Sequence, residues 1–359
     1  MLRYGLLAGG GLFCTKLYFM GGVNHHTQDL TGKVVLVTGG NSGIGREAAR
    51  KFYDLNANVI ITGRDSKKAK KFLKELDKPS ATQSKMDFIQ VDFSDLGQVK
   101  KLAEDLKAKH QKLDLLVNNA GCNFKDYHLP EDGVETTMKV NHLAPTYLTF
   151  QLLPLLENAE KARIVNVASI VHKGTSMGYA GPPMEPNFDN YWDQTVPKFD
   201  PLYTYSQSKL ANVFFTTGLQ KYLDRQDSVV HETKGRWGSK KKEEKPVVEA
   251  RNIKTVCLHP GVVDTGLMRN LEGKIPFYRF LDGLLKPITS IFMKSSLDGA
   301  QTTLYCSLLP FDKLQEGEYY ADCEVAQKSE PALDPKNVER CWEMTNKKIK
   351  EITGDEIFN

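Results

Sequence analysis

Short apolar runs alternate with amphipathic segments along the chain from Gly32 onward. Most of the runs are apolar at consecutive positions, which is typical of strands covered on both faces. The pattern predicts strands at Lys33–Thr38, Val59–Gly63, Asp87–Asp92, Leu113–Asn118, Arg163–Ala168, Lys254–His259 and Tyr319–Cys323. Helical spacing predicts helices that include Gly45–Leu55, Ser66–Leu76, Leu96–His110, Pro145–Glu157 and Ser206–Leu223. Alternating strands and helices predict a doubly wound α/β domain, a parallel sheet of about seven strands with helices on both faces.

The first 26 residues form an apolar segment that precedes this domain. The segment carries Arg3 and Lys16 and has no acidic residue before Asp29. A membrane-spanning helix needs about 20 apolar residues, and the segment nearly reaches that length, although Lys16 interrupts it. Three interpretations remain open: an uncleaved membrane anchor, a cleaved mitochondrial targeting segment, or a buried arm.

Two internal stretches interrupt the alternation. Residues 174–201 are rich in Pro, Gly, Asn and aromatic residues, and residues 228–250 are charged, with KGRWGSKKKEEK at their centre. Stretches of this length without a regular pattern are usually functional loops or disordered insertions. We interpret both as insertions in one domain that spans residues 31–345.

A glycine-rich loop, VTGGNSGIG at Val37–Gly45, follows the first predicted strand and opens the first predicted helix. Three of its glycines have the spacing GxxxGxG, which permits a tight turn, close approach of backbone to a pyrophosphate, and close packing of helix on strand. The helix N-terminus presents free N–H groups and a positive dipole end to such an anion. A turn without a ligand is the alternative, but the strand–turn–helix context favours a dinucleotide site. The residues expected to contact the cofactor here are Gly39, Asn41, Ser42, Gly43, Ile44 and Gly45.

The residue after the second predicted strand indicates which dinucleotide binds. An acidic residue at this strand end would hold the ribose 2′-hydroxyl of NAD, but the strand ends at Gly63 and Arg64 follows. A guanidinium binds a 2′-phosphate in bidentate fashion, so NADP(H) is favoured over NAD(H), although Asp65 is close enough to interfere. Asp92 ends the third predicted strand and is placed either to bind the adenine amine or to cap the turn.

Three further stretches carry candidate chemistry: NNAG at Asn118–Gly121, NVAS ending at Ser169, and YSQSK at Tyr205–Lys209. Tyr205 and Lys209 are four residues apart and share one helix face. A free phenol has a pKa of about 10, and a nearby ammonium is expected to lower it toward the range useful for acid–base catalysis. The Ser169 hydroxyl can bind the substrate oxygen. A chance YxxxK pair is the alternative, but the glycine loop in the same chain favours a catalytic pair.

Together these motifs resemble those of the short-chain dehydrogenase/reductase family, which also carries a sequence similar to HPGVVDT at His259–Thr265. The resemblance covers roughly Thr31 to Cys341. Within the family it is strongest to retinol-dehydrogenase-like members, through stretches such as KVNHLAPTYLT, YSQSKLANVFFT and GAQTTLY.

The resemblance implies a Rossmann fold and a role for each matching residue. It implies that Tyr205 is the acid/base, that Lys209 binds the nicotinamide ribose and tunes Tyr205, that Ser169 orients the substrate, and that Asn141 holds a water in a proton relay. It also implies that the cofactor cleft is lined by Asn118, Ala120, Gly121, Pro260, Gly261 and Thr265. The stretch from Ser169 to Tyr205 is longer than is typical of the family, so the resemblance does not define the substrate.

Charge, cysteine spacing and histidine spacing argue against a nucleic-acid-binding protein, a disulfide-rich protein and a metalloprotein. The net charge is +4 without a long basic stripe, so no nucleic-acid partner is expected. The six cysteines are scattered without a CxxC, which indicates reduced thiols in a reducing compartment. The eight histidines form no HExxH, so we expect no metal site.

The sequence therefore predicts an NADP(H)-dependent oxidoreductase that interconverts an alcohol and a carbonyl on a lipophilic substrate such as a retinoid, a steroid or a long-chain aldehyde or ketone. The alternative is a nucleotide-binding accessory subunit of a membrane assembly, for instance a mitochondrial one, with little or no activity. The complete set of Tyr205, Lys209, Ser169 and Asn141 argues against that alternative. We expect membrane association, at the endoplasmic reticulum or the mitochondrion, and either a homo-oligomer or a larger membrane assembly.

Overall fold

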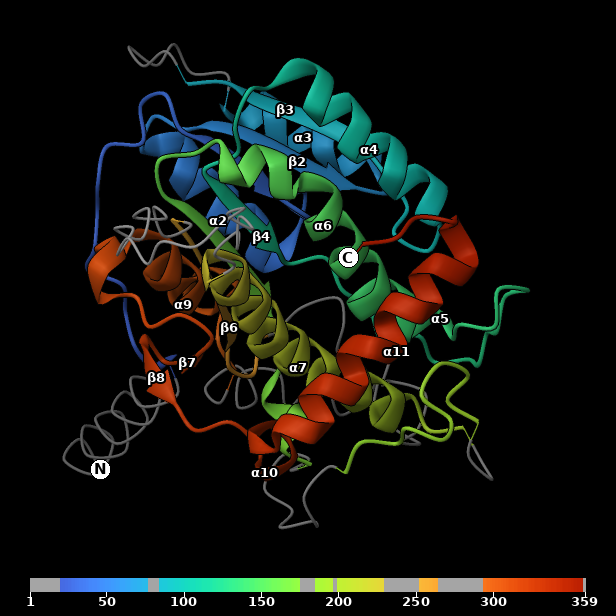
Figure 1. The fold of residues 1–359 in the computed structure, drawn as a ribbon. Coiled ribbons are helices and arrows are strands. Elements are labelled where there is room, and N and C mark those ends of the chain that lie inside the picture. The colour runs from blue at the N-terminus through green and yellow to red at the C-terminus, as the bar shows by residue number, and fades with distance from the viewer. Residues whose placement is uncertain are drawn as a thin grey trace, which may run out of the picture.

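One sheet with strand order β3-β2-β1-β4-β5-β6-β7-β8 runs through the centre of the molecule (Figure 1). The computed structural model describes residues 20–76, 84–174, 185–195, 199–228, 252–263 and 293–357. The strands are β1 Val34–Val37, β2 Asn58–Gly63, β3 Met86–Gln90, β4 Leu115–Asn118, β5 Ala162–Val167, β6 Ile253–His259, β7 Tyr319–Ala321 and β8 Glu324–Ala326. The first seven are parallel, and β8 pairs antiparallel with β7.

Helices cover both faces of this sheet, as the alternation predicted. They are α2 Gly43–Asp54, α3 Ser66–Leu76, α4 Leu96–Lys109, α5 Thr136–Met138, the π-helix η1 Lys139–Leu143, α6 Ala144–Glu157, the 3₁₀ turn η2 Ile170–Lys173, α7 Pro201–Ser228, α9 Ser296–Leu308, the 3₁₀ turn η4 Phe311–Lys313, α10 Glu330–Leu333 and α11 Pro335–Thr353. One core lies beneath α2, α3 and α9, and the other beneath α4, α6 and α7. The doubly wound fold is thus confirmed.

The apolar runs located the strands well: all seven predicted strands are present, with each end within two residues of its predicted place. The antiparallel strand β8 was not predicted. Helix α7 begins at Pro201 rather than at the predicted Ser206, because the Asp200 carboxylate accepts the Leu202 N–H (2.9 Å) and proline suits a first helical position.

The C-terminal helix α11 lies across α7 (Figure 1). Trp342 of α11 packs among Phe150 of α6 and Phe215 and Tyr222 of α7, with ring centroids 5.7–6.3 Å apart. The approach is close, because a Cβ added at Gly218 would lie 2.8 Å from the Trp342 ring. Helix α11 extends past residue 345, where the sequence placed the end of the domain.

Residues 185–195 are the longest described part of the first insertion, and they fold into the core. Phe188 and Tyr191 are buried there, and the Tyr191 hydroxyl lies 2.9 Å from the Cys341 Sγ of α11. The Glu135 N–H donates to the Trp192 carbonyl (2.7 Å), which ties the insertion to the loop before α5. The charged second insertion lies outside the described residues from position 229 to 250.

The described part of the N-terminal segment, residues 20–26, docks against the β7–β8 edge and α9. The Asn24 N–H donates to Gln301 Oε1 (3.1 Å), and the His26 and Tyr305 rings lie 5.3 Å apart. A Cβ at Gly22 would overlap the backbone carbonyl of Asp322. The predicted anchor falls mostly on residues 1–19, which lie outside the described part. Within the described residues, no helix combines the length and apolarity that crossing a bilayer requires.

Candidate active site

Thr38, at the end of β1, joins the glycine loop to the end of β4. Its Oγ1 accepts the N–H groups of Asn119 and Ala120, each at 2.9 Å. In return the Asn119 Nδ2 donates to the Thr38 carbonyl (2.9 Å). These bonds bring the predicted Thr38–Gly45 and Asn118–Gly121 motifs together at the carboxyl edge of the sheet, where ligands bind in doubly wound folds.

The glycines of the loop are required by its geometry. Gly39 and Gly43 have φ values of 65° and 54°, which favour glycine. A Cβ at Gly45 would lie 2.7 Å from the Gly39 carbonyl and closer still to the Asn119 amide. Glycine at position 45 therefore lets the start of α2 lie directly against the Gly39 turn and Asn119. The residues Gly39–Gly45 form the glycine cradle.

The N-terminus of α2 faces this cradle without a side-chain cap. Ser42 is the N-cap residue in extended conformation, and its side chain makes no capping bond to the helix. The first turn contains no acidic residue. Free N–H groups and the helix dipole suit an anion, so these residues fit the pyrophosphate of a dinucleotide.

Arg64 is exposed at the end of β2, and its guanidinium lies 6.0 Å from the centroid of the Phe124 ring. Within the described part of the chain, Arg64 forms no ion pair with a carboxylate. The neighbouring Asp65 accepts the N–H groups of Lys67 (2.9 Å) and Lys68 (3.0 Å), and the Lys68 bond is the main cause that lowers its pKa. The Asp65 carboxylate thus caps α3.

Asn41 connects the cradle to this strand end. Its Nδ2 donates to the Asp65 carbonyl (3.0 Å), and a Cβ at Gly63 would lie 2.5 Å from the Asn41 amide. Glycine at position 63 therefore allows the loop to lie directly over the end of β2.

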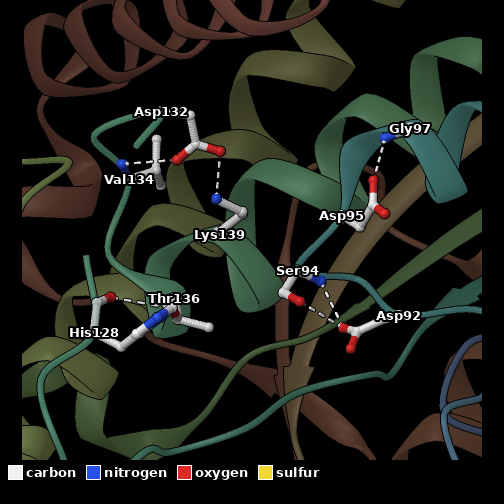
Figure 2. Close-up of polar contacts among 9 residues, drawn as sticks. All are labelled: Asp92, Ser94, Asp95, Gly97, His128, Asp132, Val134, Thr136 and Lys139. Atoms are coloured by element: carbon white, nitrogen blue, oxygen red, sulfur yellow. Dashed lines mark hydrogen bonds and ion pairs between the residues drawn. The ribbon is translucent and has the colours of Figure 1, made fainter. Parts of the chain in front are cut away.

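Asp92 caps the turn after β3, which is one of the two roles that the sequence left open (Figure 2). Its Oδ1 accepts the Ser94 N–H (2.9 Å) and the Ser94 hydroxyl (2.8 Å). A contact of Asp92 with adenine stays a prediction.

The Asn118 side chain is turned into the sheet rather than toward the cleft. It is 6% exposed, and its Nδ2 donates to Thr149 Oγ1 and Asn166 Oδ1, each at 2.9 Å. These bonds hold β4 to β5 and to α6, so the Asn118 side chain supports the cleft from beneath. Gly121 does face the candidate catalytic residues, since a Cβ there would lie 3.4 Å from Asn141 Oδ1 and from Lys209 Nζ.

The structure brings Ser169, Tyr205 and Lys209 together. The Tyr205 side chain is hydrogen-bonded to the Ser169 side chain, which follows β5. Lys209 is buried, and its Nζ lies 5.6 Å from the Tyr205 ring centroid and donates to the Val167 carbonyl (2.8 Å). One helix and one strand end thus position the three groups.

The expected lowering of the Tyr205 phenol pKa is wrong. Burial raises the pKa of Tyr205 to about 12, and the bond with Ser169 offsets this only in part. Burial also lowers the pKa of Lys209 to about 8. The physical reason is that a buried site penalises both the phenolate and the ammonium, so Tyr205 carries its proton at neutral pH.

Asn141 lies in the π-helix η1, an irregular element that is frequent at functional sites. Its Nδ2 donates to the Cys122 carbonyl (2.8 Å) and to Ser208 Oγ (2.9 Å), and its Oδ1 accepts the Cys122 N–H (2.8 Å). Asn141 therefore joins the loop after β4 to the helix that carries Tyr205. The proton-relay water stays a prediction.

The residues that hold this π-helix were not predicted from the sequence. Glu135 is buried and accepts the N–H groups of Thr137 (2.7 Å) and Met138 (3.0 Å), and Lys139 pairs with Asp132 (Figure 2). Glutamate is not among the preferred N-cap residues, so the sequence offered little indication that Glu135 caps α5.

The Pro260–Gly261 turn follows β6. Gly261 has a φ of 86°, its N–H donates to His259 Nδ1 (2.9 Å), and a Cβ there would lie 2.7 Å from the Lys294 side chain. Thr265 lies outside the described residues.

Five cysteines fall in the described part of the chain, and all five are free thiols, as expected: Cys122, Cys257, Cys306, Cys323 and Cys341.

Comparisons with known proteins find a matching family model, similar sequences and similar structures. Residues 33–181 match the family model described as short chain dehydrogenase. The chain is 31% identical to retinol dehydrogenase 12 of Homo sapiens over 330 residues, 92% of this chain and 90% of that protein. It is 30% identical to retinol dehydrogenase 14 of Mus musculus over 356 residues, 94% and 93% of the two chains. A Pseudomonas aeruginosa structure titled RhlG/NADP active-site complex has a TM-score of 0.56 at 23% identity and covers 81% of this chain and 94% of its own.

Proposed function

Because the chain belongs to the short-chain dehydrogenase family and is a retinol-dehydrogenase-like alcohol/carbonyl oxidoreductase, we propose that it uses NADP(H) and acts on a lipophilic substrate, with Tyr205 as the proton donor and acceptor. The observation that carries the proposal is the meeting of two features at one edge of the sheet. These are the glycine cradle at Gly39–Gly45 and the bonded group of Ser169, Tyr205 and Lys209.

The cofactor, when bound, supplies or accepts a hydride at its nicotinamide ring. For carbonyl reduction, Tyr205 donates its phenolic proton to the carbonyl oxygen, and the raised pKa keeps that proton in place at neutral pH. Ser169, bonded to Tyr205, orients the same oxygen. Lys209 is held by the Val167 carbonyl with its Nζ beside Gly121, where it can reach a ribose hydroxyl. For alcohol oxidation the proton moves in the opposite direction.

The preference for NADP(H) rests on Arg64 and Asp65 together. The Arg64 guanidinium is exposed and unpaired within the described part of the chain, so it is available to a 2′-phosphate. The Asp65 carboxylate would repel that phosphate, but it is hydrogen-bonded to the N-terminus of α3, whose positive dipole end partly offsets its charge.

Arg64→Asp is expected to weaken NADPH binding by roughly 10–100-fold, since hydrogen bonds to charged groups contribute about 1.5–3 kcal/mol. NADH lacks the 2′-phosphate, so its affinity should change by about threefold at most. Titration of both cofactors into wild type and variant checks this. Lys71→Asp is the matched control, because it makes the same charge change at an exposed position on α3, away from the strand end that carries Arg64. Equal losses for NADPH and NADH would remove Arg64 from the 2′-phosphate site.

The proposed substrate class is supported by the two relatives named above, both of which are retinol dehydrogenases. A retinoid, a steroid or a long-chain aldehyde or ketone is therefore the class to assay. The test is NADPH oxidation by the full chain against a panel of such carbonyl compounds, with short polar aldehydes for comparison. Binding of NADPH without turnover of any of them would favour the alternative of an accessory subunit of a membrane assembly.

We further propose that residues 1–19 attach the protein to a membrane of the endoplasmic reticulum or the mitochondrion. Deletion of residues 1–19 should move the protein to the soluble fraction without lowering its melting temperature. Deletion of residues 1–26 should also destabilise the fold, by about 1–2 kcal/mol, because it removes the Asn24 hydrogen bond and the His26–Tyr305 ring contact. Cell fractionation and thermal unfolding of both deletions check the two effects. A membrane-bound protein without residues 1–19 would locate the attachment elsewhere.

A further inference from the structure

Two buried histidines lie beneath the active-site turns and have no part in the chemistry described above. His172 is in η2, three residues after Ser169, and His259 is the last residue of β6, directly before Pro260. His172 is fully buried and His259 is 8% exposed. Burial lowers the pKa of each imidazole to about 4. Both are therefore neutral at neutral pH, and each has one donor and one acceptor nitrogen.

The hydrogen bonds of His172 define its tautomer. Its Nε2 accepts the Ser329 N–H (3.3 Å), so the ring proton is on Nδ1. That Nδ1 lies 2.7 Å from the Ser169 carbonyl, which also accepts the His172 backbone N–H (3.2 Å). His172 therefore holds the backbone of Ser169 in the turn that aims its hydroxyl at Tyr205.

His259 makes the corresponding bond to the other turn. Its Nδ1 accepts the Gly261 N–H (2.9 Å), so its ring proton is on Nε2. The bond closes the turn over Pro260 while Gly261 is in the left-handed region. His259 thus holds the turn expected to contact the nicotinamide end of the cofactor.

Tyr319 of β7 connects the two imidazoles. It is fully buried, with its ring centroid 4.7 Å from that of His172 and 5.8 Å from that of His259. Its hydroxyl has no hydrogen-bond partner among the described residues. The ring rather than the hydroxyl is therefore what Tyr319 contributes.

We propose that His172, Tyr319 and His259 form a positioning cluster that fixes the Ser169 turn relative to the Pro260–Gly261 turn. The cluster acts through the backbone bonds of the two imidazoles. The functional part of this inference rests on the proposed function, since the two turns carry the substrate-orienting hydroxyl and the nicotinamide-side backbone.

Leucine and asparagine variants of each histidine separate positioning from packing. His172→Leu and His259→Leu remove the backbone bonds, whereas asparagine can place a donor or an acceptor close to the position of Nδ1. The leucine variants are expected to lose roughly 10²-fold in kcat, because displacement of catalytic groups by about 1 Å can have that effect. The kcat is measured per NADPH-binding site, so partial unfolding does not imitate the loss. The asparagine variants should recover most of it, with KM for NADPH little changed in all four.

Variants of Tyr319 test whether its ring links the two imidazoles. Tyr319→Phe keeps the ring and should match wild type, while Tyr319→Leu should lower kcat as the histidine→leucine variants do. A wild-type kcat in the leucine variants, or equal losses in the leucine and asparagine variants, would overturn the cluster.

Amide hydrogen exchange gives a readout that needs no substrate. In Tyr319→Leu, the Gly261 and Ser329 amides should exchange faster than in wild type and in Tyr319→Phe, because both donate to the imidazoles. Unchanged exchange would overturn the cluster even if the enzyme is active. If wild type turns over no substrate yet both amides respond as expected, the proposed function fails while the cluster stands.

Discussion

Replacing Tyr205 by phenylalanine is expected to lower kcat by about 10²–10⁴-fold, the usual contribution of a positioned acid–base group. The change removes one hydroxyl and keeps the ring, so folding and NADPH affinity should be preserved. Lys209→Met should lower activity further, because it removes the Nζ bond to the Val167 carbonyl and the ammonium beside Tyr205. The measurement is NADPH oxidation with the lipophilic carbonyl panel, with thermal unfolding as the folding control.

The matched control is Tyr203→Phe, the same substitution two residues earlier on α7. The Tyr203 side chain is hydrogen-bonded to Asn187 and Gln207 rather than to Ser169. Its loss should affect stability slightly and leave kcat near the wild-type value. Equal kcat in wild type, Tyr205→Phe and Tyr203→Phe would withdraw Tyr205 from the chemistry.

Trp342→Ala is expected to reduce the free energy of unfolding by about 2–3 kcal/mol, below the range for a fully buried aromatic side chain, because the indole is only partly buried. The indole packs against Phe150, Phe215 and Tyr222, and the close approach at Gly218 leaves little room for α7 and α11 to rearrange. Chemical denaturation of wild type and variant measures the loss.

Leu333→Ala serves as the control for this prediction. Leu333 is in α10, just before α11, and is 57% exposed, so its truncation should change stability by about 0.5 kcal/mol at most. The KM values of folded Trp342→Ala protein should match wild type, because α11 holds α7 from the side away from the sheet. A loss no larger than that of Leu333→Ala would show that the aromatic cluster contributes little to stability.

The strands were predictable because burial on both faces leaves a direct trace in the sequence. Val34–Val37 and Leu115–Asn118 are buried throughout, and such runs have few other interpretations. The short strand β8 leaves no such trace, since Glu324 and Val325 are exposed at the sheet edge. Helices α9 and α11 each begin at a recognisable N-terminal capping motif. These are the Ser295–Asp298 capping box and the Asp334–Pro335 pair, from which both helices could have been predicted.

The residue types of the candidate site were predictable, but their surroundings were not. The motifs identified Tyr205, Lys209 and Ser169, and the structure brings these three together. Spacing along a helix does not report burial, so the direction of the Tyr205 pKa shift was wrong. Nor does a motif report which way a side chain turns, as Asn118 shows by bonding within the sheet.

The position of α11 also has a consequence for synthesis. Domains form from the N-terminal side as the chain leaves the ribosome, at about 5–20 residues per second. Helix α7, with Tyr205 and Lys209, is therefore complete well before Pro335–Thr353 has been made. Until then the α7 face that carries Phe215 and Tyr222 lacks its Trp342 cover. A nascent chain that stalls in this interval exposes an aromatic surface suited to chaperones and to aggregation, although every predicted catalytic residue has already been translated.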